Sequence, residues 1–499
     1  MNLPLPKICE SYRGKSIFIT GSTGFLGKVL LEKLLFSCPD IKKIYILIRE
    51  KRGLSSKERF DKFISHEIFH RIRQKNPSIL EKLYLVEGDC ISDKLGIKED
   101  DRQLLISSVN IIFHVVAQVK FNQPVQSAVD FNVNGTLRIL NLTMEMMHLE
   151  HFVYISTAMV NPWKRQVPEK VEPFSLTGWI PNEILKLTES QTKILNDRVG
   201  DCGIYPNTYT LSKHMAEHLV VYFSKKLEKA HTIIVRPSIV TAAAFEPLIG
   251  WTDSFNGPGT VMVEAARGTL KSVIGDGNKV ADMIPVDLVA NTIIASVWHQ
   301  TIEGKKGTLT VYNCTSGGLN PITWRTAGSL ITKYTRKYPT NHILSYPDMK
   351  FRPKNIIHRV IVLFLHFLPA LAIDFGLRMS NKKQQMFKIA KIVDAAIEAN
   401  GYFTMKEWSF EIKNFQSLSA LLEKSESQYE FNCDVKSFNW DIYIGSNVLG
   451  NRKYLLKDPM TTMNSAKRKL WMLFLLRTCA QMVFVYFLLR LLQSLYVLH

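Results

Sequence analysis

Short apolar runs alternate with helix-like patterns over the N-terminal two-thirds of the chain. One run, Val109–Ala117, is apolar at almost every position, which is typical of a parallel strand buried on both faces. Strands that alternate with helices predict parallel β-α-β units. The expected fold class is therefore α/β, with a doubly wound parallel sheet of the Rossmann type. The expected strands are Ser16–Ile19, Ile44–Ile48, Leu83–Glu87, Val109–Ala117, Phe152–Ile155 and Thr232–Val235.

A glycine-rich turn, Thr20–Gly27, joins the first strand to the helical pattern that follows it. In this context Gly21 permits the tight turn, Gly24 leaves room for a pyrophosphate, and Gly27 lets the helix pack closely. Phosphates would bind the free N–H groups of the helix N-terminus, where the helix dipole favours negative charge. The alternative is a plain structural turn. The residues expected to bind a dinucleotide here are Gly21, Ser22, Thr23, Gly24, Phe25, Leu26 and Gly27.

The second expected strand ends in a basic group. An acidic residue at this position would bind the ribose 2′-hydroxyl of NAD, whereas an arginine accommodates the 2′-phosphate of NADP. Arg49 stands here, with Lys51 and Arg52 just behind it, so the sequence favours NADP. The alternative is a set of solvated loop cations, and Glu50 lies among them.

Three further strand ends are expected to approach the coenzyme. Asp89 follows the third strand, where its carboxylate would meet the adenine amino group; an Asx turn is the alternative. Ala117 ends the fourth strand, where backbone must pass close to the coenzyme, and Pro237 follows the sixth. His114 lies inside the apolar fourth strand, so we interpret it as a hydrogen-bonded core residue and not as a catalyst.

Tyr209 and Lys213 lie four residues apart in a helical pattern, so they share one helix face. A phenol has a pKa of about 10, which is too high for ready proton transfer at pH 7. A neighbouring ammonium such as Lys213 lowers that pKa and can also hold the nicotinamide ribose. The fifth strand ends in Ser156 and Thr157, and we prefer Thr157 as a hydroxyl donor because it lies one residue further out. The alternative for Tyr209 and Lys213 is a surface pair on an amphipathic helix.

The C-terminal third has a different character. Residues 356–375 are strongly apolar, but charged residues, a histidine and a proline interrupt them. The uninterrupted run is too short to span a bilayer, so we expect either a core helix or an interfacial helix. An amphipathic helix is expected over 387–400, ended by Gly401, within a small helical domain of about residues 355–450. At the other end of the chain, residues 1–14 contain two prolines and are expected to form a loose arm.

The tail combines a basic cluster, Lys467–Lys469, with an apolar stretch that runs from Leu470 to His499. Leu470–Leu489 is long enough to cross a bilayer, although Arg477 at depth would cost about 2.5–3.5 kcal/mol. We expect a C-terminal anchor over 470–490, with the basic cluster and the catalytic part on the cytosolic side. A helical hairpin that lies in the membrane interface is the alternative.

The chain has 499 residues and a net charge of +19, which favours an anionic partner such as a phosphorylated coenzyme or an acidic lipid. No aromatic-interleaved basic stretch supports nucleic-acid binding. Seven scattered cysteines without a CxxC pair predict no disulfide framework and no metal site. The N-terminus lacks the charged and apolar regions of a secretory signal.

With these residues in view, the chain resembles the fatty acyl-CoA reductases, most closely those of insects. The resemblance covers residues 10–450 in the family's order. It is carried by TGSTGFLGKVLLEKLL (20–35), LIREKRG (47–53), FVYISTA (152–158), YTLSK (209–213), ADMIPVD (281–287), YNCTSGGLNPITW (312–324) and YFTMKEWSF (402–410).

The resemblance implies an NADP-binding domain of the extended short-chain dehydrogenase type with a substrate lobe (10–350). A helical domain like that of male-sterility proteins (355–450) and a membrane tail (470–490) would follow. It also implies reduction of long-chain or very-long-chain acyl-CoA to a primary alcohol by NADPH, through an aldehyde and with release of CoA. Thr157, Tyr209 and Lys213 would be the catalytic residues.

The sequence departs from the family's usual pattern at Met159, Val116, Gln118 and the pair Leu248-Ile249. These departures bear on chain-length preference more than on the chemistry. The alternatives are a reductase that stops at the aldehyde, a sterol or nucleotide-sugar dehydrogenase, and an inactive membrane scaffold. A homodimer is left open, and the expected membrane is that of the endoplasmic reticulum or the peroxisome.

Overall fold

The computed structural model describes the chain except for residues 1–4, 201–202, 382 and 498–499. It contains two compact units, and neither is continuous in sequence. Unit 1 comprises 1–249, 282–321 and 407–438; unit 2 comprises 250–281, 322–406 and 439–499. The linear boundaries expected above (10–350, 355–450 and 470–490) stay predictions, because packing into a unit does not mark where a sequence domain begins.

Unit 1 is built on a seven-stranded sheet in the order β11-β7-β5-β4-β1-β2-β3. Every neighbouring pair in it is parallel, which confirms the expected doubly wound α/β class. All six expected strands are present, and β11 is added at one edge. The strands are β1 (Ser16–Thr20), β2 (Lys43–Ile48), β3 (Leu83–Glu87), β4 (Ile111–His114), β5 (His151–Ile155), β7 (His231–Pro237) and β11 (Leu309–Cys314).

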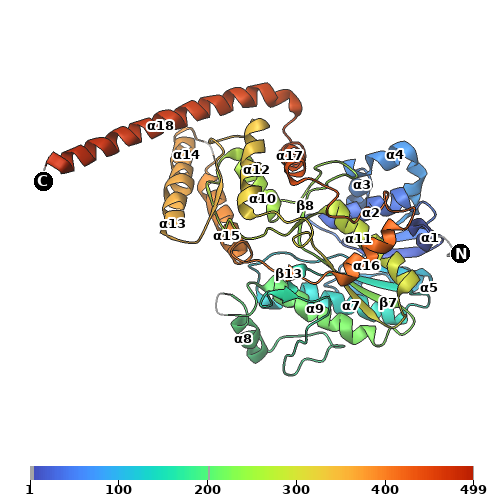
Figure 1. Ribbon diagram of the computed structural model, residues 1–499. Coiled ribbons are helices and arrows are strands. Elements are labelled where there is room, and N and C mark those ends of the chain that lie inside the picture. Colours follow the sequence, from blue (N-terminus) through green and yellow to red (C-terminus); the bar gives the residue numbers. More distant parts are fainter. Residues whose placement is uncertain (1–4, 201–202, 382, 498–499) are drawn as a thin grey trace. The chain divides into compact units, whose positions relative to one another are not determined.

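Helices cover both faces of this sheet (Figure 1). One layer contains α2 (Phe25–Ser37), α11 (Val286–Glu303) and α16 (Lys413–Glu423), and the other contains α5 (Glu99–Ser108), α7 (Gly135–Glu145) and α9 (Thr208–Ser224). Smaller elements fill the connections. They are α3 (Ser56–Ile64), η1 (Glu67–Phe69), α4 (His70–Lys75), η2 (Pro77–Lys82), η3 (Asp93–Gly96), α6 (Val125–Ala128), η4 (Val129–Asn134), η5 (Ala158–Val160), α8 (Glu189–Asp197), and the two-stranded pairs β6 (Gln166–Val167) with β13 (Ser409–Phe410) and β8 (Ile239–Thr241) with β10 (Met283–Pro285).

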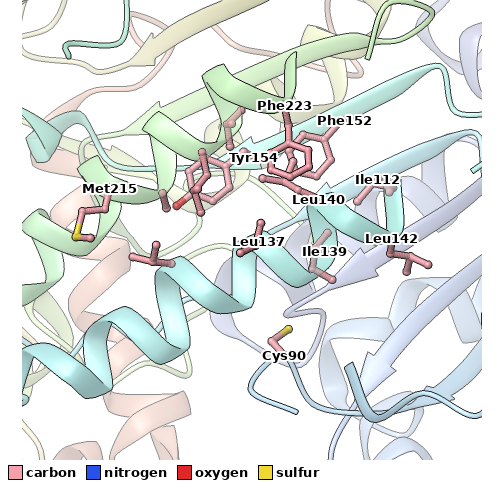
Figure 2. Packing of buried hydrophobic residues seen from close by; sticks show 14 of the residues in the cluster. Cys90, Ile112, Leu137, Ile139, Leu140, Leu142, Phe152, Tyr154, Met215 and Phe223 are labelled. Atoms are coloured by element: carbon pink, nitrogen blue, oxygen red, sulfur yellow. The ribbon is translucent and has the colours of Figure 1, made fainter. Parts of the chain in front are cut away.

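The core of unit 1 lies between the sheet and the layer formed by α7 and α9. Figure 2 shows Leu137 and Leu140 of α7 gathered with Phe223 of α9 and Phe152 of β5. All four are at most 2% exposed. This packing holds α9, the helix that carries the Tyr-Lys pair, against the strand that ends in Ser156 and Thr157.

The N-terminal segment differs from the loose arm expected for residues 1–14. Residues Ile8–Tyr12 form a short helix, α1, whose Ile8 and Tyr12 are fully buried. The hydroxyl of Tyr12 donates to the carbonyl of Ile294 at 2.8 Å, and the indole N–H of Trp298 donates to the carbonyl of Pro6 at 2.8 Å. Contacts with α11, almost 300 residues away along the chain, therefore order this segment.

Unit 2 is mainly helical. Its one small sheet pairs β9 (Ser272–Ile274) with β12 (Lys350–Arg352) in the parallel sense. Its helices are α10 (Pro258–Arg267), α12 (Trp324–Lys337), α13 (Ile356–Val362), η6 (Leu363–Phe367), α14 (Leu368–Met379), α15 (Met386–Thr404), α17 (Trp440–Gly450), η7 (Asn451–Leu455), η8 (Met460–Thr462) and α18 (Met463–Val497).

Two expectations for this unit need correction. Gly401 does not end the amphipathic helix, because α15 continues to Thr404. A Cβ at Gly401 would lie 3.1 Å from Cγ2 of Ile274, so this glycine allows the helix to pack closely on β9. The stretch 356–375 is not a core helix: within the helix Ile356–Met379, only 17% of the most apolar window is buried.

One buried ion pair joins α9 to β7. Arg236 and Glu217 are both fully buried, with Nε to Oε1 at 2.8 Å and Nη2 to Oε2 at 2.6 Å. The same guanidinium donates to the carbonyls of Pro168 and Lys170 at 2.9 and 3.0 Å. The pair therefore ties the helix, the strand and the segment after β6 together.

We predict that Arg236→Met lowers the free energy of unfolding by about 3–5 kcal/mol, because it leaves the Glu217 carboxylate buried without its partner. The double variant Arg236→Met/Glu217→Leu should be more stable than Arg236→Met alone, since it removes both charges. Thermal unfolding of the wild type, the single variants and the double variant measures this. If the double variant loses the sum of the two single effects, the pair is not coupled in this way.

Candidate active site

The turn between β1 and α2 leaves no room for side chains at two of its glycines. Gly21 has a φ of +77°, and a Cβ there would lie 2.6 Å from the backbone nitrogen of Val116. A Cβ at Gly27 would lie 2.1 Å from the carbonyl oxygen of Gly21. Gly27 thus packs the first turn of α2 against the glycine turn itself. Only glycine allows the chain to make this cradle.

The cradle fits the diphosphate of a dinucleotide. Gly24 is the N-cap of α2, so the N-terminus of that helix, which favours an anion, lies at the cradle. The hydroxyl of Ser22 is fully buried in the turn and has no hydrogen-bond partner among the residues that the structure describes. Thr23, Phe25 and Leu26 complete the segment predicted from the sequence.

The ends of β2 and β3 bring two predicted coenzyme residues together. Nη1 of Arg49 lies 2.8 Å from Oδ2 of Asp89. Oδ1 of Asp89 accepts the N–H of Ile91 at 3.3 Å, which is the Asx turn considered as the alternative. Asp89 therefore caps its loop and pairs with Arg49, and the structure places both at the carboxyl edge of the sheet.

A cluster of positive charges surrounds this position. Burial lowers the pKa of Lys51, and the charges of Arg49, Arg59, Arg52 and Lys120 lower it further. Like charges brought this close repel one another and favour an anion between them. The cluster fits an additional phosphate on the adenosine ribose.

Ala117 and Pro237 also lie at this edge. Ala117 follows β4, and the side chain of Asn132 holds the next residue by accepting the N–H of Gln118 at 2.9 Å and donating to its carbonyl at 3.2 Å. Pro237 is the last residue of β7, in register with Cys314 of β11. The loop after β4 is thus fixed where it passes the glycine cradle.

His114 is a neutral core residue, as its position in the sequence indicated. Thr136 donates its hydroxyl hydrogen to the carbonyl of Asn132 at 2.7 Å, so it accepts from Nε2 of His114 at 3.0 Å. Nδ1 of His114 then accepts from the hydroxyl of Thr20 at 2.8 Å. Burial and the charge of Lys213 lower the pKa of His114 to about 3.

Lys213 is buried behind the end of β5. Its Nζ donates to the carbonyl of Ile155 at 2.6 Å and to the hydroxyl of Tyr154 at 3.2 Å. Burial lowers the pKa of Lys213 to about 7, and the charge of Glu217 opposes this shift. The lysine fixes α9 to the last residue of β5, immediately before Ser156 and Thr157.

Tyr209 and Thr157 meet at this point. Burial raises the pKa of Tyr209 well above its usual value, and a hydrogen bond with the Thr157 hydroxyl opposes that rise. The sequence predicts that Lys213 lowers the pKa of Tyr209, but in the structure the ammonium is directed to Ile155 and Tyr154 and does not contribute to that pKa. Thr157 also accepts the N–H of Met159 at 3.2 Å, whereas the buried hydroxyl of Ser156 has no partner in the described part of the chain.

Sequence reasoning missed three residues that support this group. Tyr154 receives the lysine, Glu217 opposes the loss of its charge, and Asn132 donates to the hydroxyl of Ser212 at 2.9 Å. Glu217 carries a signal in the sequence, because it continues the four-residue spacing of Tyr209 and Lys213 along one helix face. Tyr154 and Asn132 carry none, since their roles depend on contacts across the sheet.

Comparison with known proteins agrees with this arrangement. Two family models, both described as male sterility protein, match the chain: an NAD-binding model over residues 19–293 and a second model over 365–458. Fatty acyl-CoA reductase 1 of Rattus norvegicus is 36% identical over 468 residues, which are 93% of this chain and 89% of that protein. Fatty acyl-CoA reductase 2 of Bos taurus is 36% identical over 465 residues, with the same coverage of each chain.

Among solved structures, the terminal R domain from the myxalamid PKS-NRPS biosynthetic pathway is similar in fold. The TM-score is 0.59 at 20% identity, and the alignment covers 91% of this chain and 95% of that one. The glycine cradle therefore belongs to an NAD(P)-binding domain.

We predict that Lys213→Met keeps the fold but changes its response to pH. Between the folded pKa of about 7 and the ordinary value near 10.5, the unfolded wild type binds the extra proton, so its stability rises with pH. The variant lacks this contribution. Its melting temperature relative to wild type should be highest near pH 7 and fall toward pH 9.

Lys225→Met, at an exposed position after the same helix, is the control for the added methionine. A difference between Lys213→Met and wild type that does not change with pH would contradict a buried, desolvated ammonium.

Proposed function

The chain belongs to the fatty acyl-CoA reductase family, and from this premise we propose that it reduces long-chain acyl-CoA to a primary alcohol with NADPH. It is an oxidoreductase with a nicotinamide coenzyme. One NADPH would reduce the thioester to an aldehyde, with CoA leaving as the thiol, and a second NADPH would reduce the aldehyde to the alcohol. The observation that carries the proposal is the group formed by Thr157, Tyr209 and Lys213 at the end of β5, next to the glycine cradle on the same sheet edge.

The coenzyme would be held by the cradle from Gly21 to Gly27 and would supply the hydride. Tyr209 and Thr157 would both donate to the thioester carbonyl oxygen, where negative charge develops. Tyr209 would then transfer its proton to that oxygen as the general acid. The N–H of Met159 already bonds to the Thr157 oxygen, which leaves the Thr157 hydrogen for donation. The same two donors would serve the aldehyde carbonyl in the second reduction.

Lys213 would have two roles in this site. Its ammonium fixes α9 to Ile155, so Tyr209 stays beside Thr157. It would also hold the ribose hydroxyls of the coenzyme from the same position. Because burial destabilises its charge, an approaching hydroxyl oxygen would be a favourable additional partner.

The charge cluster at the end of β2 supports NADPH over NADH. Arg49 and its neighbours Lys51, Arg52, Arg59 and Lys120 would attract the 2′-phosphate, which NADH lacks. Asp89 would give up part of its ion pair with Arg49 and accept a hydrogen bond from the adenine amino group.

The tail would anchor the enzyme in the membrane of the endoplasmic reticulum or the peroxisome, with the catalytic part facing the cytosol. Two helices of the described chain, Ile356–Met379 and Met460–Phe487, are long and apolar enough to cross a membrane. In α18, Arg477 forms an ion pair with Asp348 at 2.8 Å. This pair would hold Arg477 at the protein surface, near the start of the expected anchor over 470–490.

We predict that Tyr209→Phe lowers kcat for acyl-CoA reduction by about 10²–10⁴-fold, because it removes the general acid. Coenzyme affinity should stay near wild type. Purified protein with a long-chain acyl-CoA and NADPH, assayed for alcohol and aldehyde separately, measures the loss and identifies the product. Tyr222→Phe, further along α9, is the matched control. Activity of Tyr209→Phe near that of the control would reject the role of Tyr209.

We predict that Arg49→Gln raises KM for NADPH about 10-fold or more, since it removes a charged hydrogen bond to the 2′-phosphate. KM for NADH should change far less. Because Asp89 then loses its ion pair, Arg49→Gln/Asp89→Asn is a second variant that separates phosphate binding from this local effect. Lys57→Gln, on α3 and paired with Asp61, is the control. Equal changes for both coenzymes would contradict the NADPH assignment.

A further inference from the structure

An exposed apolar surface covers most of the helix formed by α13, η6 and α14. Such a continuous apolar surface on a folded protein usually marks a binding site. Its most exposed members are Met379 (76%), Ile356 (71%) and Phe375 (66%). We call this set the α13–α14 surface. It comprises Ile356, Ile357, Val360, Leu363, Phe364, Leu365, Leu368, Leu371, Ile373, Phe375 and Met379.

The two histidines of the same helix face the body of unit 2. Nδ1 of His358 lies 2.8 Å from the hydroxyl of Ser272, and Nε2 of His366 accepts the N–H of Lys271 at 2.9 Å. These two histidines are eight residues apart, which is about one residue more than two turns of an α-helix contain. The wider π-turn of η6 accommodates the extra residue, so both histidines lie on one face. Both imidazoles are thus buried on one side, and the apolar residues are left on the other.

Asp374 attaches the end of the helix in a similar way. Its carboxylate accepts the N–H groups of Gln385, Met386 and Phe387 at 3.0, 2.9 and 2.9 Å, which caps the start of α15. The helix is therefore held at three points by residues that would otherwise be costly in an apolar environment.

Both ends of the helix return to the same small sheet. Before it, β12 pairs with β9 from Lys350 to Arg352. After it, α15 runs back, and the hydroxyl of Thr404 donates to the carbonyl of Ile274 in β9 at 2.7 Å. A spanning helix needs about 20 apolar residues in the lipid, which is almost the whole length of Ile356–Met379. The bonds of His358 with Ser272 and of His366 with Lys271 hold the first half of this helix against the protein, so the part that is left free is too short to span.

The charge around this surface fits an anionic lipid layer. Residues 351–400 contain eight Lys and Arg but only three Asp and Glu. Asp374 caps α15 and Glu398 pairs with Lys354, so two of the three acidic charges are already engaged. Exposed Arg359, Arg378 and Lys388 remain near the apolar residues, where they would meet phosphate headgroups.

The tail helix leads to the same part of unit 2. Arg477 of α18 pairs with Asp348, Asp348 pairs with Lys271 at 3.0 Å, and the N–H of Lys271 donates to His366. Three successive contacts thus connect Arg477 of the tail helix to His366, in the middle of the helix that carries the α13–α14 surface. A bilayer that receives the tail would lie within reach of that surface.

We propose that the α13–α14 surface lies in the membrane interface as a second, non-spanning contact, with its apolar residues in the lipid and its histidines held in the protein. This inference concerns the helical unit and does not depend on the reductase activity. A second copy of the chain is the other occupant that an apolar face admits, and the experiment separates the two.

The test uses the full chain in sealed vesicles of phosphatidylcholine and phosphatidylserine, with Cys9, Cys202 and Cys479 replaced by serine. Single cysteines at Phe364→Cys and Leu371→Cys carry an environment-sensitive fluorophore. Tyr429→Cys, 91% exposed in unit 1, is the aqueous control. Circular dichroism and thermal unfolding check that each variant is folded.

We expect the probes at residues 364 and 371 to be quenched by lipids spin-labelled near the headgroup and to be several-fold less sensitive to aqueous iodide than the control. Iodide quenching equal to the control would overturn the proposal. Protection from iodide without lipid quenching would assign the surface to another protein copy instead.

A second measurement distinguishes lying on the membrane from crossing it. Lys354→Cys and Ser380→Cys, at exposed polar positions just outside the two ends of the helix, are treated with a membrane-impermeant maleimide outside the sealed vesicles. Both should react to the same extent as Tyr429→Cys. Reaction of only one end would show a spanning helix and would refute the interfacial arrangement.

Discussion

The hydrogen bond from Lys213 to the carbonyl of Ile155 is the contact on which the site depends. This bond joins α9 to the end of β5 through a buried ammonium. Burial lowers the pKa of that ammonium, and the negative charge of Glu217 opposes the shift. A buried cation needs every partner it has, so its position is strongly determined. Tyr209, one turn away on the same helix, is consequently held beside Thr157, where a carbonyl oxygen would be bound. Catalytic geometry here follows from an electrostatic requirement of the fold.

The glycine cradle imposes a second constraint of a steric kind. Gly21 and Gly27 allow the turn, the helix and the end of β4 to approach more closely than any side chain permits. Because all seven strands are parallel, their carboxyl ends meet at one edge, and the cradle, the Arg49–Asp89 pair and the catalytic group share it. The first constraint would orient Tyr209, the proposed acid, and the second would make room for the coenzyme beside it.

The sequence was sufficient for the features that local pattern determines. Apolar runs predicted six strands of the sheet, and the Gly spacing and the Tyr-Lys spacing predicted the two ends of the site. It was insufficient where distant contacts decide. α1 forms because Trp298 and Ile294 bond to it, and Lys213 turns away from Tyr209 because Tyr154 and Ile155 offer partners. Local pattern also does not predict the two compact units, because each takes segments from three parts of the chain.

The helix Ile356–Met379 shows why composition alone leaves such a segment ambiguous. Its apolar residues suit a protein core, a membrane span and a membrane surface equally well. Its two histidines and its aspartate are unfavourable in any apolar environment unless they are hydrogen-bonded. The structure shows which side of the helix faces the protein. His358, His366 and Asp374 each form hydrogen bonds with the rest of unit 2, so the face that they occupy is the buried one. The remaining circumference must be covered by something apolar. His358 and His366 hold the first half of the helix against β9 and Lys271, so a lipid surface can cover the outer face of the helix without breaking a buried hydrogen bond.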